Sequence, residues 1–326
     1  MARYLGVDGG GSKTAFALID DSGQVQARAY TATSYYFTDG FEVVERVLQE
    51  GISAICATAG IEPSEIDAAF FGIPGYGESS ADIDRLDAVP RPILGHDSYS
   101  CNNDMVCGWA GSLAGDDGIN VISGTGSMTY GERAGVGHRV GGWGELFGDE
   151  GSAYWIAVKG LNVFSRMSDG RVPRGPLYEL MRQRLQITSD LDAVSLVIEK
   201  WGGSRSEIAD LAKTVCAAAA ADDVRAARLL RYAVDELTAL VETTRLLVGF
   251  SDDETVPVSY SGGMFSDDRY RGLFQAAMNK MSARYELRRP VLDPALGAAV
   301  YAAKQNGKPL DPDALAKLAA SQPDPR

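Results

Sequence analysis

The sequence is poor in residues that bind metals or form disulfides. It contains only two histidines, and its four cysteines form neither a C-x-x-C pair nor another metal-ligand spacing; they are Cys56, Cys101, Cys107 and Cys216. This pattern is typical of reduced thiols rather than of a disulfide framework or a zinc site. We therefore expect buried thiols in a reducing compartment.

Long apolar runs and an excess of positive charge are also lacking. No apolar run reaches the length of about 18 residues that a membrane span requires, and the first residues do not form a secretory signal pattern. Acidic residues number 44 against 31 lysines and arginines, which gives a net charge of −13. Clustered cations are what nucleic acids and anionic membranes require. We expect a cytoplasmic protein that binds neither, although local N–H groups could still hold an anionic nucleotide.

The chain is long enough for two domains. Its 326 residues are 45% hydrophobic, which allows two cores of medium size. Periodicity predicts the order β-β-β-α-β-α-β-α up to about residue 115, and a second strand-turn-strand unit opens at Gly118 and continues mainly as helices. We predict an α/β fold with an N-terminal lobe at residues 1–115 and a helix-enlarged C-terminal lobe at residues 116–326. A cleft between two such lobes is where ligands commonly bind.

Some local assignments are specific expectations. Residues 92–94 are expected to form a strand, and residues 140–151 a connector rich in glycine and tryptophan. Trp155 lies on the helix that follows and is expected to pack in the core. The segment beyond Gly307 is rich in proline, aspartate and alanine and is expected to be peripheral.

A glycine-rich stretch near the N-terminus is the first candidate for a ligand site. A strand-like run ends at Asp8 and a second begins at Ala15. Glycine lets the backbone approach a ligand closely, so the tip of this hairpin offers N–H groups to a phosphate. Asp8 supplies the oxygen ligand that a hydrated Mg²⁺ prefers. The candidate phosphate contacts are Gly9, Gly10, Gly11, Ser12, Lys13 and Thr14.

Two other interpretations compete for this stretch. A Walker A loop has lysine where this chain has Ser12, and it opens a helix rather than a strand. The Walker interpretation therefore fails. An ordinary glycine-rich hairpin without a ligand stays open.

Two more glycine-rich turns follow strands in the second half. One joins the strands expected at residues 118–122 and 128–132, and the other joins a strand to a helix. The first lacks the spacing of a dinucleotide fingerprint. Alone, either turn could be structural; together with the first hairpin they predict a second contact on a polyphosphate and a surface for a purine. The residues concerned are Gly124, Thr125, Gly126, Ser127, Gly262, Gly263 and Met264.

Taken together, these motifs resemble those of a known family. Their order and spacing are similar to those of the N-acetylglucosamine kinases, which belong to the BadF/BadG/BcrA/BcrD-type ATPases of the actin, hexokinase and Hsp70 superfamily. The resemblance covers residues 1–160 most closely. The matching segments are Val7–Thr14, Asn103–Asp104, Ser123–Ser127, Gly141–Gly144, Gly148–Trp155 and Ser261–Gly263.

The resemblance implies two ribonuclease-H-like domains that close on ATP, Mg²⁺ and a sugar. The two hairpins would bracket the phosphates, Gly262 and Gly263 would approach the adenosine, and Asp104 would be the general base for the sugar hydroxyl that attacks the γ-phosphate. It also implies a homodimer. The sugar-binding residues would be Ser34, Asp104, Gly142, Trp143, Gly144, Asp149, Glu150 and Ala153.

Two points stay open within this interpretation. Asp104 could serve only as a helix N-cap, and Asp97 is a rival base because it lies nearer the end of the strand expected at residues 92–94. We favour Asp104 because its spacing to Gly111 and Gly124 matches the family. Amino-sugar kinases usually have asparagine after the third strand, where this chain has Ser34-Tyr35-Tyr36. N-acetylglucosamine or glucosamine is the leading substrate, but this departure leaves the sugar open.

Two other functions are compatible with parts of the pattern. An activator ATPase of 2-hydroxyacyl-CoA dehydratase or benzoyl-CoA reductase needs cysteines that hold an iron–sulfur cluster between two subunits. Of the four cysteines, only Cys101 and Cys107 are candidates for cluster ligands, and their spacing matches that role only loosely. A non-catalytic sugar sensor is the third hypothesis, and the presence of both Asp8 and Asp104 argues against it.

Overall fold

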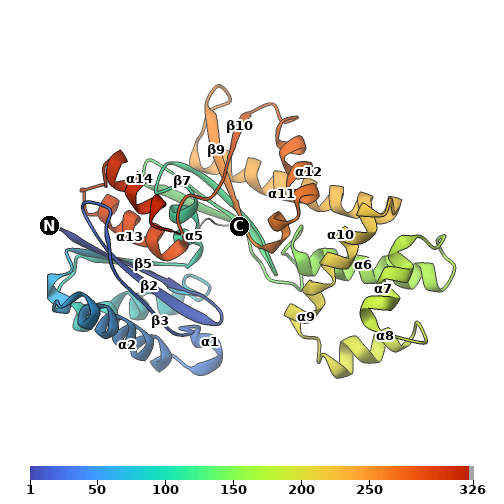
Figure 1. Cartoon of the computed structure of the whole chain (residues 1–326), viewed down its shortest axis with the longest axis horizontal. Helices are drawn as coiled ribbons and strands as arrows, with labels where there is room; N and C mark the ends of the chain where they lie inside the picture. Colours follow the sequence, from blue (N-terminus) through green and yellow to red (C-terminus); the bar gives the residue numbers. More distant parts are fainter. Residues whose placement is uncertain (323–326) are drawn as a thin grey trace. The chain divides into compact units, whose positions relative to one another are not determined.

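The computed structural model describes residues 1–322, apart from the side chains of residues 38 and 39. It divides into two compact units (Figure 1). Unit 1 comprises Met1–Asp117 and Arg289–Arg326, and unit 2 comprises Gly118–Arg288. Each unit is built on one five-stranded sheet with helices around it, which confirms the predicted α/β class.

The two sheets repeat one topology. The strand orders are β3-β2-β1-β4-β5 in unit 1 and β8-β7-β6-β9-β10 in unit 2. In both, the first three strands are antiparallel neighbours and the last two run parallel to the first. The internal repeat predicted from the sequence is therefore present. The strands are β1 (Arg3–Gly9), β2 (Lys13–Asp20), β3 (Val25–Ala32), β4 (Ala68–Gly72), β5 (Tyr99–Asn102), β6 (Gly118–Ser123), β7 (Ser127–Arg133), β8 (Val136–Gly141), β9 (Thr255–Ser261) and β10 (Arg284–Arg288).

In unit 1, helices cover both faces of the sheet, and successive residues of β1 face the two helical layers alternately. Leu5 and Val7 belong to the apolar core that includes the buried face of α2, while Gly6 on the opposite face lies directly against the backbone of α13. Successive side chains of a strand point to opposite faces, so one strand can serve both layers. The helices of this unit are α1 (Tyr36–Asp39), α2 (Glu42–Ala59), α3 (Ile83–Ala88), α4 (Pro90–Leu94), α5 (Met105–Ser112), α13 (Pro294–Gln305) and α14 (Pro312–Ala320).

The C-terminal segment belongs to unit 1, which corrects the prediction that residues 116–326 form one lobe. Helix α13 packs against β1, β4 and α5, and in Figure 1 it lies beside the strands of that unit. A Cβ on Gly297 would overlap the backbone of Gly111, so two helices meet where neither has a side chain. The expectation of a peripheral tail beyond Gly307 is also wrong, because α14 buries Leu318 and places Ala314 against Gly23.

Unit 2 is enlarged by helices, as predicted. Its core joins the inner faces of β6 and β9 to the long helix α11 and the helices around it. Short 3-10 and π-helical turns occupy several connections. The helices are α6 (Ala153–Ser168), α7 (Pro176–Leu185), α8 (Asp192–Ser195), α9 (Arg205–Asp210), α10 (Ala212–Ala220), α11 (Val224–Val248) and α12 (Asp268–Met278).

One local prediction of secondary structure is wrong, and one strand was not predicted. Residues 92–94 lie in helix α4, which begins with Pro90; proline is favourable at the first helical position and cannot donate to a strand ladder. The strand of this region is β5, a short edge strand whose residues are all half-buried. The connector expected at residues 140–151 is present from residue 142, but the segment before it forms the edge strand β8, which the sequence pattern did not predict and which pairs with β7. Short edge strands carry little hydrophobic alternation, which explains both differences.

Two further features agree with the composition. All four cysteines are free, and three of them are buried. Within residues 1–322, none of the helices is both long enough and apolar enough to span a bilayer.

We predict that Gly297→Ala destabilises unit 1. The added Cβ would overlap the backbone of Gly111, and backbone atoms of two packed helices cannot move aside cheaply. Urea unfolding should show a loss of about 1–3 kcal/mol, the usual cost of overpacking. The matched control is Gly108→Ala on α5, where nothing lies within 4 Å of the new Cβ. It should be neutral or stabilising by up to about 1 kcal/mol; similar losses in both variants would contradict this account of the packing.

Candidate active site

The sheet of unit 1 brings Asp8 and Asp104 together. Asp8 pairs in register with Gly72 of β4, and Gly72 pairs with Asn102 of β5. The chain then turns through Asn103 into α5, so that a Cβ on Gly72 would lie 3.1 Å from the Cα of Asp104. Ligands of α/β sheets commonly bind at the carboxyl ends of parallel strands, and both aspartates lie at that edge.

The side chain that caps α5 is that of Asn103. Its Oδ1 accepts a hydrogen bond from the Met105 N–H at 3.2 Å, and its Nδ2 donates to the carbonyl of Tyr76 at 3.1 Å. Asp104 stands at the N-cap position, but its carboxylate makes no capping hydrogen bond to the first turn of α5. The purely structural interpretation of Asp104 as a cap therefore loses its support.

The rival aspartate lies on the wrong side of the strand. Asp97 precedes β5 instead of following it, and it forms an exposed ion pair with Arg91 at 3.1 Å. The argument that favoured Asp97 rested on a strand at residues 92–94, where the structure has helix α4.

Asp8 is held in an environment that disfavours its charge. Burial, together with the carboxylates of Asp104 and Asp293, raises its pKa to about 7, and Lys13 opposes this rise. A cation would relieve this repulsion. Within residues 1–322 there is no cluster of three or more metal-ligating side chains. Mg²⁺ commonly uses one or two carboxylates together with phosphate oxygens and water, so the donor set at Asp8 fits that ion.

The hairpin from Gly9 to Thr14 is anchored at its base and open at its tip. The Gly10 N–H donates to the Lys13 carbonyl at 2.8 Å. A Cβ on Gly9 would lie 2.5 Å from Pro74 and 2.7 Å from the Ser34 hydroxyl, whereas one on Gly11 would meet nothing within 4 Å. Ser12 and Lys13 are exposed and Thr14 is buried. The tip is therefore accessible to a ligand.

Ser34 lies beneath this hairpin. It is 1% exposed, and the Thr14 hydroxyl donates to its Oγ at 3.4 Å. The neighbouring Thr33 hydroxyl donates to the Gly10 carbonyl at 2.8 Å. These contacts give the loop a supporting role for the hairpin, and a sugar contact by Ser34 stays a prediction.

In unit 2, three segments predicted to belong to a site meet at one point. Gly262 has a φ of 97° and its Cα packs against the backbone of Ser123 and Gly124. The Ser127 hydroxyl donates to the Glu150 carbonyl at 2.7 Å, and the Ala153 N–H donates to the Gly124 carbonyl at 2.8 Å. The hairpin at Gly124–Ser127, the segment around Asp149 and the turn at Gly262 are thus one cluster.

The predicted contacts at the ends of these segments differ in exposure. A Cβ on Gly263 would meet nothing within 4 Å, so this glycine faces open space. Met264 is buried in the core, so only its backbone can contact a ligand. Trp143 stands between Gly142 and Gly144, both with positive φ, and its side chain is 71% exposed. It is therefore free to pack on a ring of a ligand.

Asp149 is the most constrained polar residue of the cluster. It is 3% exposed and has a φ of 56°, a left-handed conformation that costs free energy for a residue other than glycine. Its Oδ2 would lie 2.8 Å from a Cβ on Gly126. Burial raises the pKa of this carboxyl, while the charge of Arg205 and the backbone N–H groups of Ser127 and Gly144 oppose that rise.

Arg205 is a member of this cluster that the sequence did not reveal. Its guanidinium donates to Asp149, and its Nε lies 3.4 Å from a carboxylate oxygen of Glu145. Arg205 begins α9, 56 residues after Asp149, in a helical region without a recognisable motif. Only the preceding Gly202-Gly203-Ser204 turn marks the position.

The two cysteines considered for a metal cluster are poorly placed for one. Cys107 is fully buried, its thiol donates to the Val7 carbonyl at 3.4 Å, and burial raises its pKa. Burial also raises the pKa of the half-buried Cys101 thiol. Metal ligation requires the thiolate, so these positions speak against the activator hypothesis.

Known proteins resemble this chain over nearly its whole length. An N-acetyl-D-glucosamine kinase from Dictyostelium discoideum is 28% identical over 311 residues, which cover 92% of this chain and 97% of that protein. An N-acetylmuramic acid/N-acetylglucosamine kinase from Clostridium acetobutylicum is 28% identical over 304 residues, which cover 93% and 98%. The crystal structure of a candidate N-acetylglucosamine kinase from Chromobacterium violaceum matches with a TM-score of 0.67 and 25% identity, covering 93% of this chain and 99% of that one.

The family match covers both units. The sequence profile of the BadF/BadG/BcrA/BcrD ATPase family matches residues 5–302, which include both glycine-rich hairpins, Asp104 and the Asp149 segment. The family predicted from the motifs is thereby confirmed: the chain belongs to the BadF/BadG/BcrA/BcrD ATPase family.

Proposed function

We propose that this protein is an ATP-dependent kinase that transfers the γ-phosphate to a hydroxyl of an amino sugar or hexose. N-acetylglucosamine and glucosamine are the leading substrates. The observation that carries the proposal is the pair of Asp8 and Asp104 beside an open glycine-rich hairpin, at the ends of three parallel strands. ATP use follows from the family, and the relatives named as N-acetylglucosamine kinases support the sugar.

Each carboxylate of the pair has its own role in this proposal. Asp104 accepts the proton of the attacking hydroxyl, since phosphoryl transfer depends on positioning, charge neutralisation and a base near the nucleophile. Asp8 holds Mg²⁺. Bound MgATP supplies the phosphoryl group and a cation that neutralises charge developing on the phosphates.

The remaining groups bind and orient. Backbone N–H groups of the hairpins at Gly9–Thr14 and Gly124–Ser127 bind phosphate oxygens, and the backbone at Gly262–Met264 supports the adenosine. Asp149 accepts hydrogen bonds from sugar hydroxyls and Trp143 covers a face of the ring. The other proposed sugar contacts are Ser34, Gly142, Gly144, Glu150 and Ala153.

Two further assignments rest on the family resemblance and the composition. We propose that the protein is a homodimer, and that it works in the cytoplasm, where ATP is available and its free thiols stay reduced.

The direct test of the function is sugar-dependent ADP release. We expect turnover when purified protein is supplied with MgATP and one member of a panel of hexoses, hexosamines and N-acetylhexosamines. The hexosamines and their N-acetyl derivatives should give the largest kcat/KM. The proposal would be contradicted if the rate of ADP release with each sugar of the panel were the same as the rate without sugar.

The general base is tested by Asp104→Ala. Loss of general base catalysis should reduce kcat by at least about a hundredfold, while sugar and ATP affinities change only a few-fold. The control is Asp97→Ala, which removes the rival carboxylate and should keep near-normal turnover. If the two variants exchange these phenotypes, the base assignment is wrong.

Arg205→Gln tests the link between Arg205 and Asp149. Without the guanidinium, the pKa of the buried Asp149 carboxyl should rise further. We therefore expect a sugar KM about tenfold higher, an effect that grows as pH falls, with the ATP KM within about twofold of the original. Arg184→Gln is the control, because Arg184 also pairs with an aspartate in unit 2, Asp210, but outside the cluster. Equal effects of the two substitutions would refute the link.

Asp8 makes the metal-free protein sensitive to pH. Its pKa is about 7 in the folded state and about 4 in an unfolded chain, so the folded state binds the proton more tightly. The stabilisation that protonated Asp8 provides is therefore complete below about pH 4 and is lost as pH rises through 7.

Thermal unfolding in EDTA from pH 4 to 8 checks this expectation. As pH rises, the melting temperature of Asp8→Asn should increase by several degrees relative to that of the unmodified protein. Mg²⁺ with ATP should reduce this difference in melting temperature. Asp84→Asn, at an exposed position of α3, should show no such trend. A constant gap between Asp8→Asn and the unmodified protein would show that Asp8 is not held in this way.

A further inference from the structure

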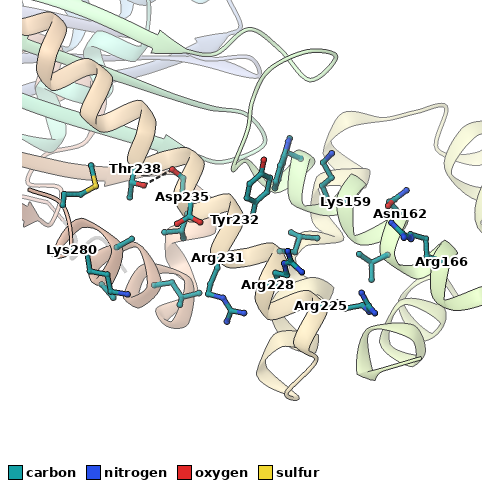
Figure 2. Close-up of a pocket in the computed structure, with 18 residues that line it drawn as sticks. Lys159, Asn162, Arg166, Arg225, Arg228, Arg231, Tyr232, Asp235, Thr238 and Lys280 are labelled. Carbon is teal, nitrogen blue, oxygen red and sulfur yellow. Dashed lines mark hydrogen bonds between the residues drawn. The ribbon is translucent and has the colours of Figure 1, made fainter. Parts of the chain in front are cut away.

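Unit 2 contains a large groove that none of the proposed catalytic or binding residues lines. It has a volume of about 980 Å³ and is formed by α6, α11, α12 and the residues just after α12. Figure 2 shows its lining side chains on these elements. The volume is in the range of small-molecule sites.

Positive charge is concentrated on this groove. Its lining contains six basic side chains and one acidic residue, Asp235. Within residues 1–322, the ion pairs of the structure involve none of the six. Six cations beside a single lining carboxylate repel one another, and a bound anion would reduce that cost. The six are Lys159, Arg166, Arg225, Arg228, Arg231 and Lys280.

These cations come from three segments that line the groove. Arg225, Arg228 and Arg231 follow one another along α11, and Lys159 and Arg166 project from α6 (Figure 2). With a rise of about 1.5 Å per residue, the first and last cation of each helix are roughly 10 Å apart along the helix axis. Lys280, which lies just after α12, adds a further cation to the lining of the groove. Guanidinium groups bind phosphate oxygens in a bidentate geometry, so this spacing fits two phosphates on one compact molecule.

An extended polyanion fits less well. The chain as a whole carries a net charge of −13, so a nucleic acid or an anionic membrane that extends past the groove comes within the screening length of about 8 Å of acidic surface and is repelled. A compact anion stays within the local positive field of the groove.

The groove also offers an apolar and aromatic surface. The rings of Trp155 and Tyr232 lie 5.6 Å apart at 36°, and Tyr232 is 55% exposed. Trp155, expected from the sequence to be a core residue, is only half-buried and lines the groove. Leu229 and Val234 add buried apolar side chains. A ring of the ligand can therefore pack beside its charged groups.

We propose that this basic groove binds a compact organic phosphate, with at least two negative charges and a cyclic body. The site is distinct from the candidate active site, and its existence does not depend on the kinase proposal. It is a second ligand site of unit 2.

Isothermal titration with fructose 1,6-bisphosphate tests the proposal on the full chain. A non-hydrolysable ATP analogue with Mg²⁺ is kept saturating, so that nucleotide occupies the phosphate hairpins. We expect one molecule bound per chain, with an affinity that falls as salt rises. The triple variant Arg225→Gln/Arg228→Gln/Arg231→Gln should bind at least tenfold more weakly, and Asp235→Asn about twofold more tightly.

Two further variants keep the result interpretable. Lys159→Gln/Arg166→Gln removes the two cations that α6 contributes to the groove, and it should also weaken binding about tenfold. Arg46→Gln, at an exposed position on α2 of unit 1, should change the affinity less than twofold. Unchanged melting temperatures of the groove variants confirm that they fold.

Several outcomes would overturn the proposal. One is the absence of binding by the unmodified protein, and another is equal affinity in the groove variants and the unmodified protein. Inorganic phosphate that binds as tightly as the bisphosphate would show a site without the proposed selectivity. Binding of anionic vesicles or single-stranded DNA but not of the bisphosphate would assign the groove to a polyanion. Loss of a dimer in the triple variant by sedimentation, without bisphosphate binding, would make it a subunit interface.

Discussion

The repulsion between the carboxylates of Asp8 and Asp104 is the constraint on which the proposed chemistry depends. The register of β1, β4 and β5 brings these carboxylates together, because Gly72 between them has no side chain and α5 begins against it. Burial and this repulsion together raise the pKa of Asp8 to about 7. A cation bound beside these two carboxylates would offset their repulsion.

Glycine at close contacts holds the same framework in place. In unit 1, Gly6, Gly111 and Gly297 let α13 lie directly on β1 and α5. In unit 2, Gly262 lets the turn after β9 rest on the backbone at Ser123 and Gly124. The hairpins of the candidate site therefore depend on backbone packing behind them, and not only on the glycines at their tips.

Charge is distributed unevenly in unit 2. Arg205 compensates the buried Asp149 near the hairpin, whereas the basic groove gathers six cations around one lining carboxylate, Asp235. In a chain with 44 acidic and 31 basic residues, the first arrangement adjusts the carboxylate that we propose binds the sugar, and the second gives the local positive field on which the proposed phosphate site rests.

The sequence by itself determined the two repeated α/β lobes, the positions of the glycine-rich hairpins and the family. It also identified Asp8 and Asp104 as candidate site residues. These depend on local signals: strand periodicity, turn residues and short motifs with fixed spacing. Only the tertiary structure decided the course of the chain through β5 and β8, the return of α13 to unit 1, the supporting role of Ser34, and the positions of Arg205 and the basic groove. Edge strands bury too little to leave a pattern, and contacts between residues such as Asp149 and Arg205, 56 positions apart, depend on how the helices pack, which no local signal records.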